Sequence, residues 1–407
     1  MKTTIGILAP RMTEEESRSI SLDFVLRLKK THRQLTLNCL HDLLRDPEAA
    51  AVPPGYSYEE HSIPAAAFYL TGLLRAHGYD TVMDYRWDTA ALERMAKASP
   101  RAVCVSTTML LHRRSLENVV ASIRTFMPDA LIVVGGILVW KSYTWLETIS
   151  AHPEIAAGMP EDEVGRWAVF PCWRPELDAD VIVAAPHGGP TLIRILDEIE
   201  KGNRAGLEDI PNLALPGTSG EFHFTARADE GIDHDTNFTR WDLLDALPVR
   251  VPVTTSVGCP HRCGFCDFCR MYPKLVFRSR QSLLAEFTMI RDLLPRNPGT
   301  FLLQFTDDNA FANAPRIEEV CHALLDSKLE LFWASLMRVS SITEANVDLV
   351  KRSGLVLAMT GVESGDPGQL KRMNKALNLD KLRAGIELLD RNHIPVAMSL
   401  VMGYPGE

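Results

Sequence analysis

The chain has 407 residues, of which 46% are hydrophobic and 23% charged, and its formal net charge is −9. These proportions are ordinary for a globular protein of two or three domains, and the acidic balance argues against non-specific binding to nucleic acid. No apolar run reaches the ~18 residues of a membrane-spanning helix, and the N-terminus lacks the apolar core and cleavage site of a signal peptide. We therefore expect a cytoplasmic protein with no membrane and no nucleic-acid partner.

Strands and helices alternate over the first 200 residues. A helix is predicted over Ala65–Ala76, because Pro64 stands at its first turn and Gly78 follows its end, and another near Ile20–Leu44. The predicted strands are Ile5–Ala9, Thr81–Met83, Ala102–Ser106, Ala130–Val134 and Asp180–Ala184. This alternation predicts a doubly wound α/β domain over residues 1–202.

Residues 203–248 are rich in Pro, Gly, Asp and Thr and have little hydrophobic periodicity, which predicts a linker. A second alternating region follows over residues 249–407. Its predicted strands lie near 251–256, 301–305, 331–334, 356–360 and 395–401. Pro315 opens a helix whose apolar residues, Cys321 among them, fall on one face, so we expect Cys321 in the core.

Three cysteines follow the first strand of this second region, in the loop Cys259-Pro-His-Arg-Cys263-Gly-Phe-Cys266. Thiolates on one short loop can converge on one soft metal centre. A fourth cysteine, Cys269, leaves a zinc knuckle open, since zinc binds four thiolates, although structural zinc sites usually use two separated pairs. The other four of the eight cysteines are scattered, which favours a reducing compartment with a metal site over disulfides.

The C-x3-C-x-F-C arrangement resembles the signature of the radical S-adenosylmethionine (SAM) enzymes. The resemblance implies that Cys259, Cys263 and Cys266 hold a [4Fe-4S] cluster whose open iron binds SAM, and that Cys269 is not a ligand. It also implies a partial (β/α)6 barrel, of which about five strands are present here. Because the chain stops just past the fifth strand, we expect a C-terminally truncated chain, with a short natural variant as the alternative.

Four segments at the predicted strand ends resemble SAM-binding segments of that family. By this resemblance the Asp307–Asp308 pair would contact the SAM amine, Glu363 the ribose hydroxyls and Arg338 the SAM carboxylate. The implied SAM contacts are Asp307, Asp308, Ser335, Arg338 and Glu363, with Phe265 beside SAM or the cluster. Turn chemistry after a strand remains an alternative for Asp308, and a structural ion pair remains one for Arg338. The segment Lys371–Lys375 also resembles a family feature, but we interpret it as a solvated helix end.

The first domain resembles a cobalamin-binding Rossmann-like domain, in which hydroxyl residues after the third strand and a Gly pair after the fourth line the slot for the nucleotide tail. The implied cobalamin contacts are Ser106, Thr107, Thr108, Gly135 and Gly136. The family's D-x-H-x-x-G motif, which supplies a lower axial histidine, is absent, and we expect His187 to be a polar loop residue. A Rossmann-like relic that binds nothing is the alternative.

Together these resemblances imply a cobalamin-dependent radical SAM enzyme, most simply a class B methyltransferase with a [4Fe-4S] cluster, SAM and cobalamin as cofactors. A 5′-deoxyadenosyl radical would take a hydrogen from an unactivated carbon, and methylcobalamin would deliver the methyl group. We predict no catalytic residue beyond the cluster and cofactors, which carry the hard steps. The expected partners are a small-molecule or peptide substrate and a flavodoxin- or ferredoxin-type electron donor. Oxidative cyclisation or rearrangement, and a non-catalytic truncated cluster-binding protein, stay open.

Overall fold

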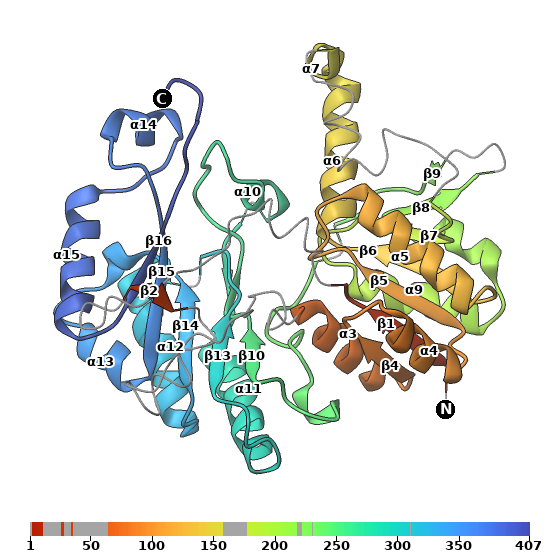
Figure 1. The fold of residues 1–407 in the computed structure, drawn as a ribbon, viewed down its shortest axis with the longest axis horizontal. Helices are drawn as coiled ribbons and strands as arrows, with labels where there is room; N and C mark the ends of the chain where they lie inside the picture. Colours follow the sequence, from red (N-terminus) through yellow and green to blue (C-terminus); the bar gives the residue numbers. More distant parts are fainter. Residues whose placement is uncertain are drawn as a thin grey trace. The chain divides into compact units, whose positions relative to one another are not determined.

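The computed structural model describes residues 2–10, 26–27, 34–35, 64–157, 177–217, 222–229, 231–272, 274–309 and 311–407. These residues form two compact units, drawn in Figure 1. The first contains the described parts of 1–22 and 62–232, and the second those of 23–61 and 233–407. The helix predicted near Ile20–Leu44 lies largely outside the described residues, where only the short antiparallel pair β2 (Leu26–Arg27) and β3 (Gln34–Leu35) is defined.

The first unit is built on a seven-stranded sheet with the order β4-β1-β5-β6-β7-β8-β9. The strands are β1 (Thr4–Leu8), β4 (Asp80–Asp84), β5 (Ala102–Ser106), β6 (Leu131–Gly135), β7 (Val181–Val183), β8 (Leu213–Pro216) and β9 (Phe222–Phe224). The first five strands in that order pair in parallel, and all five were predicted from the sequence. The strand order reverses direction at β1 and β5, which is the switch point of a doubly wound sheet.

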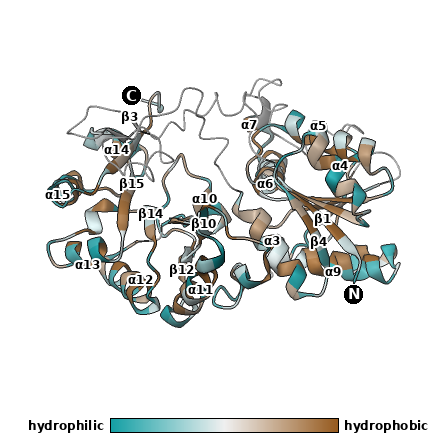
Figure 2. Ribbon diagram, turned by 60° about the horizontal axis from the view of Figure 1, so that its bottom comes forward, coloured by the Kyte–Doolittle hydropathy of each residue, from teal (hydrophilic) through white to brown (hydrophobic). Residues whose placement is uncertain are grey.

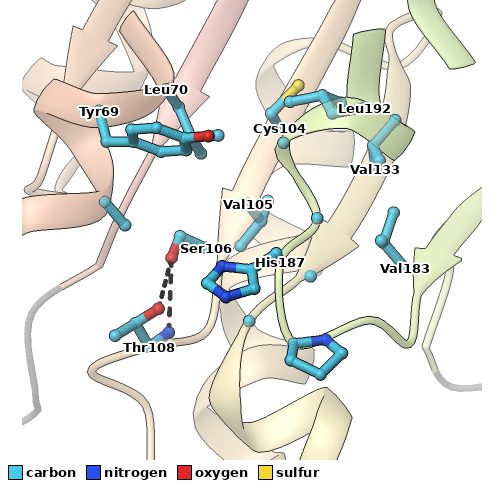
Figure 3. Close-up of a pocket in the computed structure, with 16 residues that line it drawn as sticks. Tyr69, Leu70, Cys104, Val105, Ser106, Thr108, Val133, Val183, His187 and Leu192 are labelled. Atoms are coloured by element: carbon cyan, nitrogen blue, oxygen red, sulfur yellow. Dashed lines mark hydrogen bonds between the residues drawn. The ribbon is translucent and has the colours of Figure 1, made fainter. Parts of the chain in front are cut away.

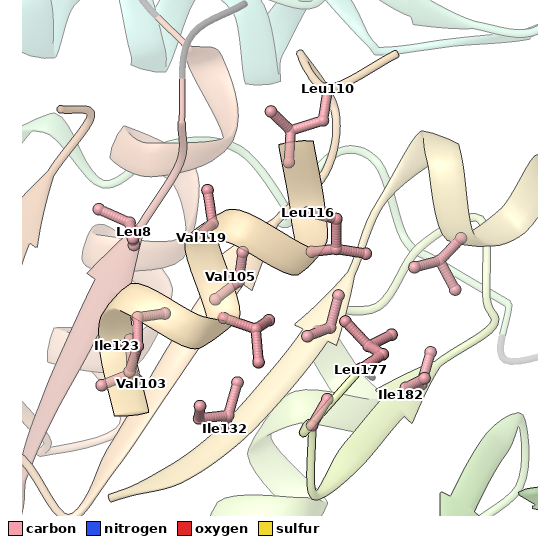
Figure 4. Close-up of a cluster of buried hydrophobic side chains, with 14 of the residues drawn as sticks. Leu8, Val103, Val105, Leu110, Leu116, Val119, Ile123, Ile132, Leu177 and Ile182 are labelled. Atoms are coloured by element: carbon pink, nitrogen blue, oxygen red, sulfur yellow. The ribbon is translucent and has the colours of Figure 1, made fainter. Parts of the chain in front are cut away.

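Helices cover both faces of this sheet because its strands are apolar on both sides. One buried cluster joins the sheet to α4 (Thr89–Lys97), α5 (Arg113–Phe126) and α6 (Ile137–Ala151), which continues into the short α7 (Pro153–Ala157); Figure 4 shows part of it. A second cluster joins the other face to α3 (Ala65–Ala76) and α9 (Gly189–Glu200). The hydropathy colours of Figure 2 follow this arrangement, with brown strands between helices that are partly teal.

The segment 203–248, predicted as a linker, contains regular structure. It includes the 3-10 helices η3 (Arg204–Asp209) and η4 (Trp241–Leu243), and its strands β8 and β9 form an antiparallel hairpin that extends the first sheet. The apolar residues Leu213–Leu215 are buried there, and they were too few to give a periodic pattern. The boundaries at 202 and 248 stay a prediction.

The second unit is built on a five-stranded, fully parallel sheet with the order β10-β13-β14-β15-β16. The strands are β10 (Arg250–Val253), β13 (Leu302–Phe305), β14 (Phe332–Leu336), β15 (Leu355–Glu363) and β16 (Val396–Leu400). These are the five predicted strands in chain order. They confirm an α/β fold with five barrel-type strands.

Helices connect these strands in the right order for a succession of β/α units. They are α11 (Arg280–Leu293) with η5 (Leu294–Arg296), α12 (Ala314–Ser327), η6 (Val339–Ser341), α13 (Val347–Arg352), α14 (Pro367–Arg372) and α15 (Leu379–Arg391). Cys321 on α12 is fully buried, as predicted. An aromatic cluster of Phe287, Phe305, Phe311 and Trp333 packs under the sheet. Among the described helices of both units, none combines the length and apolarity needed to cross a membrane.

Candidate functional site

The cysteine loop of the second unit leaves the sheet through a small antiparallel hairpin. Its strands are β11 (Ser256–Val257) and β12 (Val276–Phe277), and the loop between them carries the short helix α10 (Phe268–Met271). Gly258 begins the loop with φ +86°, and a Cβ there would overlap the carbonyl oxygen of Lys274. Only glycine fits this combination of a left-handed backbone and close approach.

Buried arginines fix the base of this hairpin. Arg278 forms a 2.5 Å ion pair with Glu286 and donates a 2.7 Å hydrogen bond to the Thr254 carbonyl. Arg316 donates to the carbonyl oxygens of Thr255, at 2.6 Å, and of Arg278, at 2.9 Å. Charges this deeply buried require partners. Besides Glu286, the partners of these two arginines are backbone carbonyl groups at the base of the hairpin that carries the cysteine loop.

Asp307 lies just past the end of β13 and holds the same backbone from the other side. Its Oδ1 accepts hydrogen bonds from the amide and hydroxyl groups of Thr255 and Ser256. Burial raises the pKa of this carboxyl to about 6, against the opposing effect of those hydrogen bonds. Its Oδ2 is buried and finds no hydrogen-bond partner in the described residues. In this structure Asp307 anchors the loop, and its contact with SAM stays a prediction.

The next two residues contact the start of the loop directly. Asp308 Oδ2 accepts a 3.1 Å hydrogen bond from the Gly258 amide, and burial raises the pKa of this carboxyl. Asn309 is buried, and its Nδ2 donates to Cys259 Sγ at 3.7 Å. The turn after β13 therefore ends the strand and also contacts the start of the cysteine loop.

The loop cysteines are free thiols of intermediate burial. Burial raises the pKa of Cys259 and of Cys263, and at Cys263 the charge of Lys375 opposes the rise. Cys269 Sγ donates to the Cys266 carbonyl oxygen at 3.1 Å, so it is turned towards its own short helix. Within the described residues, no three His, Cys, Asp or Glu side chains converge on one metal ion.

Arg338 follows β14 and contacts the loop. Its guanidinium approaches His261 Nε2 and donates to the carbonyl oxygen of Ala376. Burial and the neighbouring cations lower the pKa of His261, which favours the neutral imidazole that can accept from arginine. Ser335, three residues earlier and within β14, is fully buried and donates to the Leu336 carbonyl oxygen. Both residues thus already have hydrogen-bond partners within the protein, and their SAM contacts stay predictions.

Glu363 ends β15 with φ +62° and forms a 2.9 Å ion pair with Lys375. Both side chains are largely buried, at 9% and 16% exposure. A Cβ on Gly361 would overlap Glu363 Oε1, so this glycine makes room for the pair itself. The Lys375 ammonium also lies 5.8 Å from the centre of the Phe265 ring, which is 39% exposed. Glu363, Lys375 and Phe265 thus meet beside the cysteine loop, with Phe265 facing solvent.

The interpretation of Lys371–Lys375 as a solvated helix end agrees with the exposure of Lys371, Arg372 and Asn374, but it is wrong at Met373 and at the largely buried Lys375. Met373 is fully buried and its carbonyl oxygen accepts a 2.8 Å hydrogen bond from the Gly264 amide. Asn374 donates from Nδ2 to the Arg262 carbonyl at 2.6 Å. The composition of the segment gave no sign of these contacts, because their partners lie more than 100 residues earlier in the chain.

A separate pocket lies in the first unit, at the carboxyl ends of β5, β6 and β7 (Figure 3). It encloses about 750 Å³ of empty space, part of it open to solvent. Four of the five predicted cobalamin contacts line it: Ser106, Thr108, Gly135 and Gly136. The other lining residues are Ala66, Tyr69, Leu70, Cys104, Val105, Val133, Val183, Pro186, His187, Gly188, Gly189 and Leu192. None of the sixteen is an acid, a lysine or an arginine.

The fifth predicted contact, Thr107, does not line the pocket. It is fully buried, and both its amide and its hydroxyl donate to the Gly135 carbonyl oxygen, at 2.7 and 3.0 Å. Gly136 has φ +113°, and a Cβ there would lie 2.9 Å from the Thr107 amide nitrogen. Thr107 and Gly136 together shape the floor, while the Ser106 and Thr108 hydroxyls, 3.1 Å apart, face the space.

Several lining residues were not singled out from the sequence. Tyr69 and Leu70 come from α3, and His187 comes from the loop between β7 and α9, where Figure 3 shows its ring beside Ser106 and Thr108. From the sequence, His187 was interpreted only as a polar loop residue. Cys104 also faces the pocket, and burial raises the pKa of its thiol to about 12. The residues that follow Pro10, where the absent D-x-H-x-x-G motif would lie, are outside the described residues.

Two families match this chain, one for each unit. Residues 253–407 match the radical SAM superfamily, and residues 56–163 match the B12 binding domain. The first match begins at the end of β10 and includes the cysteine loop. The second includes α3, β5 and β6 and the hydroxyl and glycine residues of the pocket.

Two curated relatives have similar sequences. The anaerobic magnesium-protoporphyrin IX monomethyl ester cyclase of Synechocystis sp. is 21% identical over 364 residues, which is 83% of this chain and 64% of the relative. The bacteriochlorophyllide d C-12(1)-methyltransferase of Chlorobaculum tepidum is 27% identical over 157 residues, 38% of this chain and 34% of the relative. The chain thus spans less than two thirds of the length of either relative.

A solved structure shares the fold. The cobalamin-dependent S-adenosylmethionine radical enzyme OxsB, with aqua-cobalamin and S-adenosylmethionine bound, superimposes with a TM-score of 0.63 at 15% identity. The superposition covers 98% of this chain and 49% of OxsB. At this identity the likeness establishes a common fold: a B12-binding type domain followed by a radical SAM type domain.

Proposed function

Because the chain combines a B12-binding domain with a radical SAM domain, we propose that it acts as a cobalamin-dependent radical SAM enzyme that transfers a methyl group to an unactivated carbon. The observation that carries the proposal is the cysteine loop, whose three thiols stand at the carboxyl edge of a parallel sheet. Loops at that edge are where α/β domains bind ligands. A largely apolar pocket at the corresponding edge of the other sheet is the proposed second cofactor site.

The second unit fits a [4Fe-4S] cluster. Cys259, Cys263 and Cys266 are free, half-buried thiols on a loop fixed at its base by Gly258 and Asp307. Thiolates are the ligands that such clusters take. Glu363 and Phe265, beside the loop, are the residues we propose for the ribose and adenine parts of SAM. Asp308 and Ser335 are further proposed contacts, and each also forms a hydrogen bond within the protein.

The first unit fits the nucleotide tail of cobalamin. The pocket lies at the sheet edge, has no acid, lysine or arginine in its lining, and is floored by Gly136, whose positive φ and close approach to Thr107 require glycine. The hydroxyls of Ser106 and Thr108 can hydrogen-bond polar tail groups, and the apolar walls from α3 and β7 can pack against a ring. When bound, the three cofactors supply one-electron cleavage of SAM and a methyl carrier.

A second candidate reaction is oxidative cyclisation. The relative named as a cyclase aligns over 83% of the chain, against 38% for the relative named as a methyltransferase. We place methyl transfer first because the methyltransferase has the higher identity, 27% against 21%. A small-molecule or peptide substrate and an external one-electron donor are proposed for either reaction.

The proposal is tested by anaerobic reconstitution with iron, sulfide and hydroxocobalamin, followed by incubation with SAM carrying a labelled methyl group. We expect about four irons per chain, bound cobalamin, and release of 5′-deoxyadenosine that depends on a reductant. Label in the product supports methyl transfer, while an unlabelled, oxidised product supports cyclisation. An iron-loaded chain that cleaves no SAM contradicts both.

Cysteine variants form the matched control. Cys263→Ala is expected to abolish the cluster and its absorbance, because one of three ligands is lost. Cys269→Ala is expected to retain it, since that thiol already bonds the Cys266 carbonyl. If the wild type contained zinc in place of iron, and Cys269→Ala lost that zinc, the cluster assignment would be rejected.

A further inference from the structure

The end of α14 is a helix cap that also reaches the cysteine loop. The Lys375 amide bonds the Leu370 carbonyl at 2.9 Å and the Asn374 amide bonds the Lys371 carbonyl at 3.1 Å, with Asn374 at φ +51°. This is the pattern of a Schellman cap, in which the left-handed position is usually glycine and sometimes asparagine. The backbone alone would favour glycine at 374.

Asparagine at this position brings a donor that glycine lacks. Its Nδ2 donates to the Arg262 carbonyl at 2.6 Å, next to Cys263. One residue earlier, the Met373 carbonyl accepts from the Gly264 amide on the other side of Cys263. The two hydrogen bonds therefore bracket the middle cysteine of the loop.

Arg338 extends the same set of contacts. Its guanidinium joins the Ala376 carbonyl to His261, which lies midway between Cys259 and Cys263. Lys375, between the bonded residues, is held by Glu363 at 2.9 Å. A planar guanidinium presents several N–H donors in a fixed fork, so it can serve both acceptors at once.

We propose that Met373–Ala376 and Arg338 form a clamp that positions the cysteine loop for its cluster, so that Arg338 is a positioning residue and not a contact of the SAM carboxylate. This inference rests on the proposed function only in that the loop takes a cluster. Because the clamp is complete in the protein alone, its effect on the loop exists before any cofactor binds.

Asn374→Gly separates the clamp from the helix cap. Glycine keeps the left-handed cap and removes only the side-chain donor to the Arg262 carbonyl. Arg338→Ala removes the other part of the clamp, the guanidinium contacts with His261 and Ala376. We expect a chelator to remove the cluster from each variant roughly three- to tenfold faster than from wild type. A rate change of this size corresponds to the free energy of one or two hydrogen bonds. The double variant should show less than the product of the two effects, because both arms hold one loop. The matched control is Asn378→Ala, which removes the cap of α15, a 2.8 Å bond to the Lys381 amide.

Two readouts separate this role from its rivals. On the cluster-loaded fraction, SAM affinity and the EPR change on adding SAM should stay within about threefold of wild type in Arg338→Ala. If Arg338 instead contacted the SAM carboxylate, Arg338→Ala would lower the affinity for SAM by roughly tenfold or more and leave the rate of cluster loss unchanged. That result would overturn the inference. Equal cluster loss in Asn374→Gly and wild type also overturns it, as does faster loss in Asn378→Ala, which would indicate general destabilisation.

Hydrogen exchange of the cluster-free chain tests the clamp independently of the proposed function. The amides of residues 259–266 should exchange about three- to tenfold faster in Asn374→Gly and Arg338→Ala than in wild type. If wild type takes up no cluster and exchange still responds, the clamp stands and the proposed function fails. If exchange is unchanged in both variants, the clamp is rejected, whatever the cluster content.

Discussion

The two candidate sites occupy the same edge of similar parallel sheets, but they are built by opposite means. The pocket of the first unit has no acid, lysine or arginine in its lining, and its shape comes from glycines and apolar strand residues. The cysteine loop of the second unit is held by Asp307, which follows β13, and by Arg338, which follows β14, and the Glu363–Lys375 ion pair lies beside it.

The difference follows from what each site has to position. A pocket for a large, largely uncharged group needs space and close backbone approach, which small residues provide. A loop that presents three thiols has no core of its own, so polar side chains must fix it against the sheet. We therefore expect the first site to be sensitive to added volume and the second to changes of charge.

The largest effect is expected from adding one methyl group to the pocket floor. In Gly136→Ala, the backbone at φ +113° becomes strained and the Cβ lies 2.9 Å from the Thr107 amide. The strain alone costs about 1–3 kcal/mol, and relief of the clash would move the floor. We expect a lower unfolding midpoint and at least a tenfold loss of cobalamin affinity, measured by thermal unfolding and by spectral titration.

Gly202→Ala is the matched control. Gly202 also has a positive φ, +71°, but nothing lies within 4 Å of its added Cβ. It should lose some stability and keep cobalamin affinity. Equal cobalamin binding by both variants would show that the floor is not shaped as the structure indicates.

A charge effect of intermediate size is expected at Asp307. Its pKa is raised from 3.8 to about 6 in the folded protein, so between these values the folded state binds more protons than the unfolded state. The stability that this group contributes is fully present below pH 3.8 and is lost as the pH rises through 6, by about 3 kcal/mol. Asp307→Asn removes the titration and keeps an oxygen for the loop amides.

The measurement is the free energy of unfolding of both proteins by urea at several pH values. Relative to Asp307→Asn, the wild type should lose stability between pH 4 and pH 7, most steeply near about pH 5, midway between the two pKa values. A wild type that instead gains stability over this range would mean that the hydrogen bonds to Thr255 and Ser256 outweigh burial and lower the pKa of Asp307.

The strands and the loop could be predicted from the sequence because their information is local. Apolar runs bounded by Gly, Pro or polar residues marked all ten strands of the two main parallel sets, and the spacing of three cysteines marked the loop. The residues that follow strand ends were correctly placed near the sites for the same reason, since parallel strands deliver their carboxyl ends to one edge.

The residues that sequence analysis missed depend on contacts between distant segments. Asn374 and Lys375 belong to a charged helix end, and only the folded chain brings them to Arg262 and Glu363. Thr107 stands between two pocket-lining hydroxyl residues, but the strand's end turns it inward to the Gly135 carbonyl. Residue type and spacing cannot tell such a buried hydroxyl from an exposed one.

The smallest effect is expected at the two hydroxyls that do face the pocket. Ser106→Ala and Thr108→Val each break the 3.1 Å contact between these two hydroxyls. Each removes one polar group from the pocket wall and adds no atom that would clash. A single neutral hydrogen bond contributes about 0.5–1.5 kcal/mol, so cobalamin affinity should fall by roughly two- to tenfold, with the unfolding midpoint nearly unchanged. Thr107→Val loses the hydrogen bond from its hydroxyl to the Gly135 carbonyl. It should show the reverse: lower stability and a smaller change in cobalamin affinity. If Thr107→Val weakened cobalamin more than Ser106→Ala did, the division between a structural Thr107 and two ligand-facing hydroxyls would be wrong.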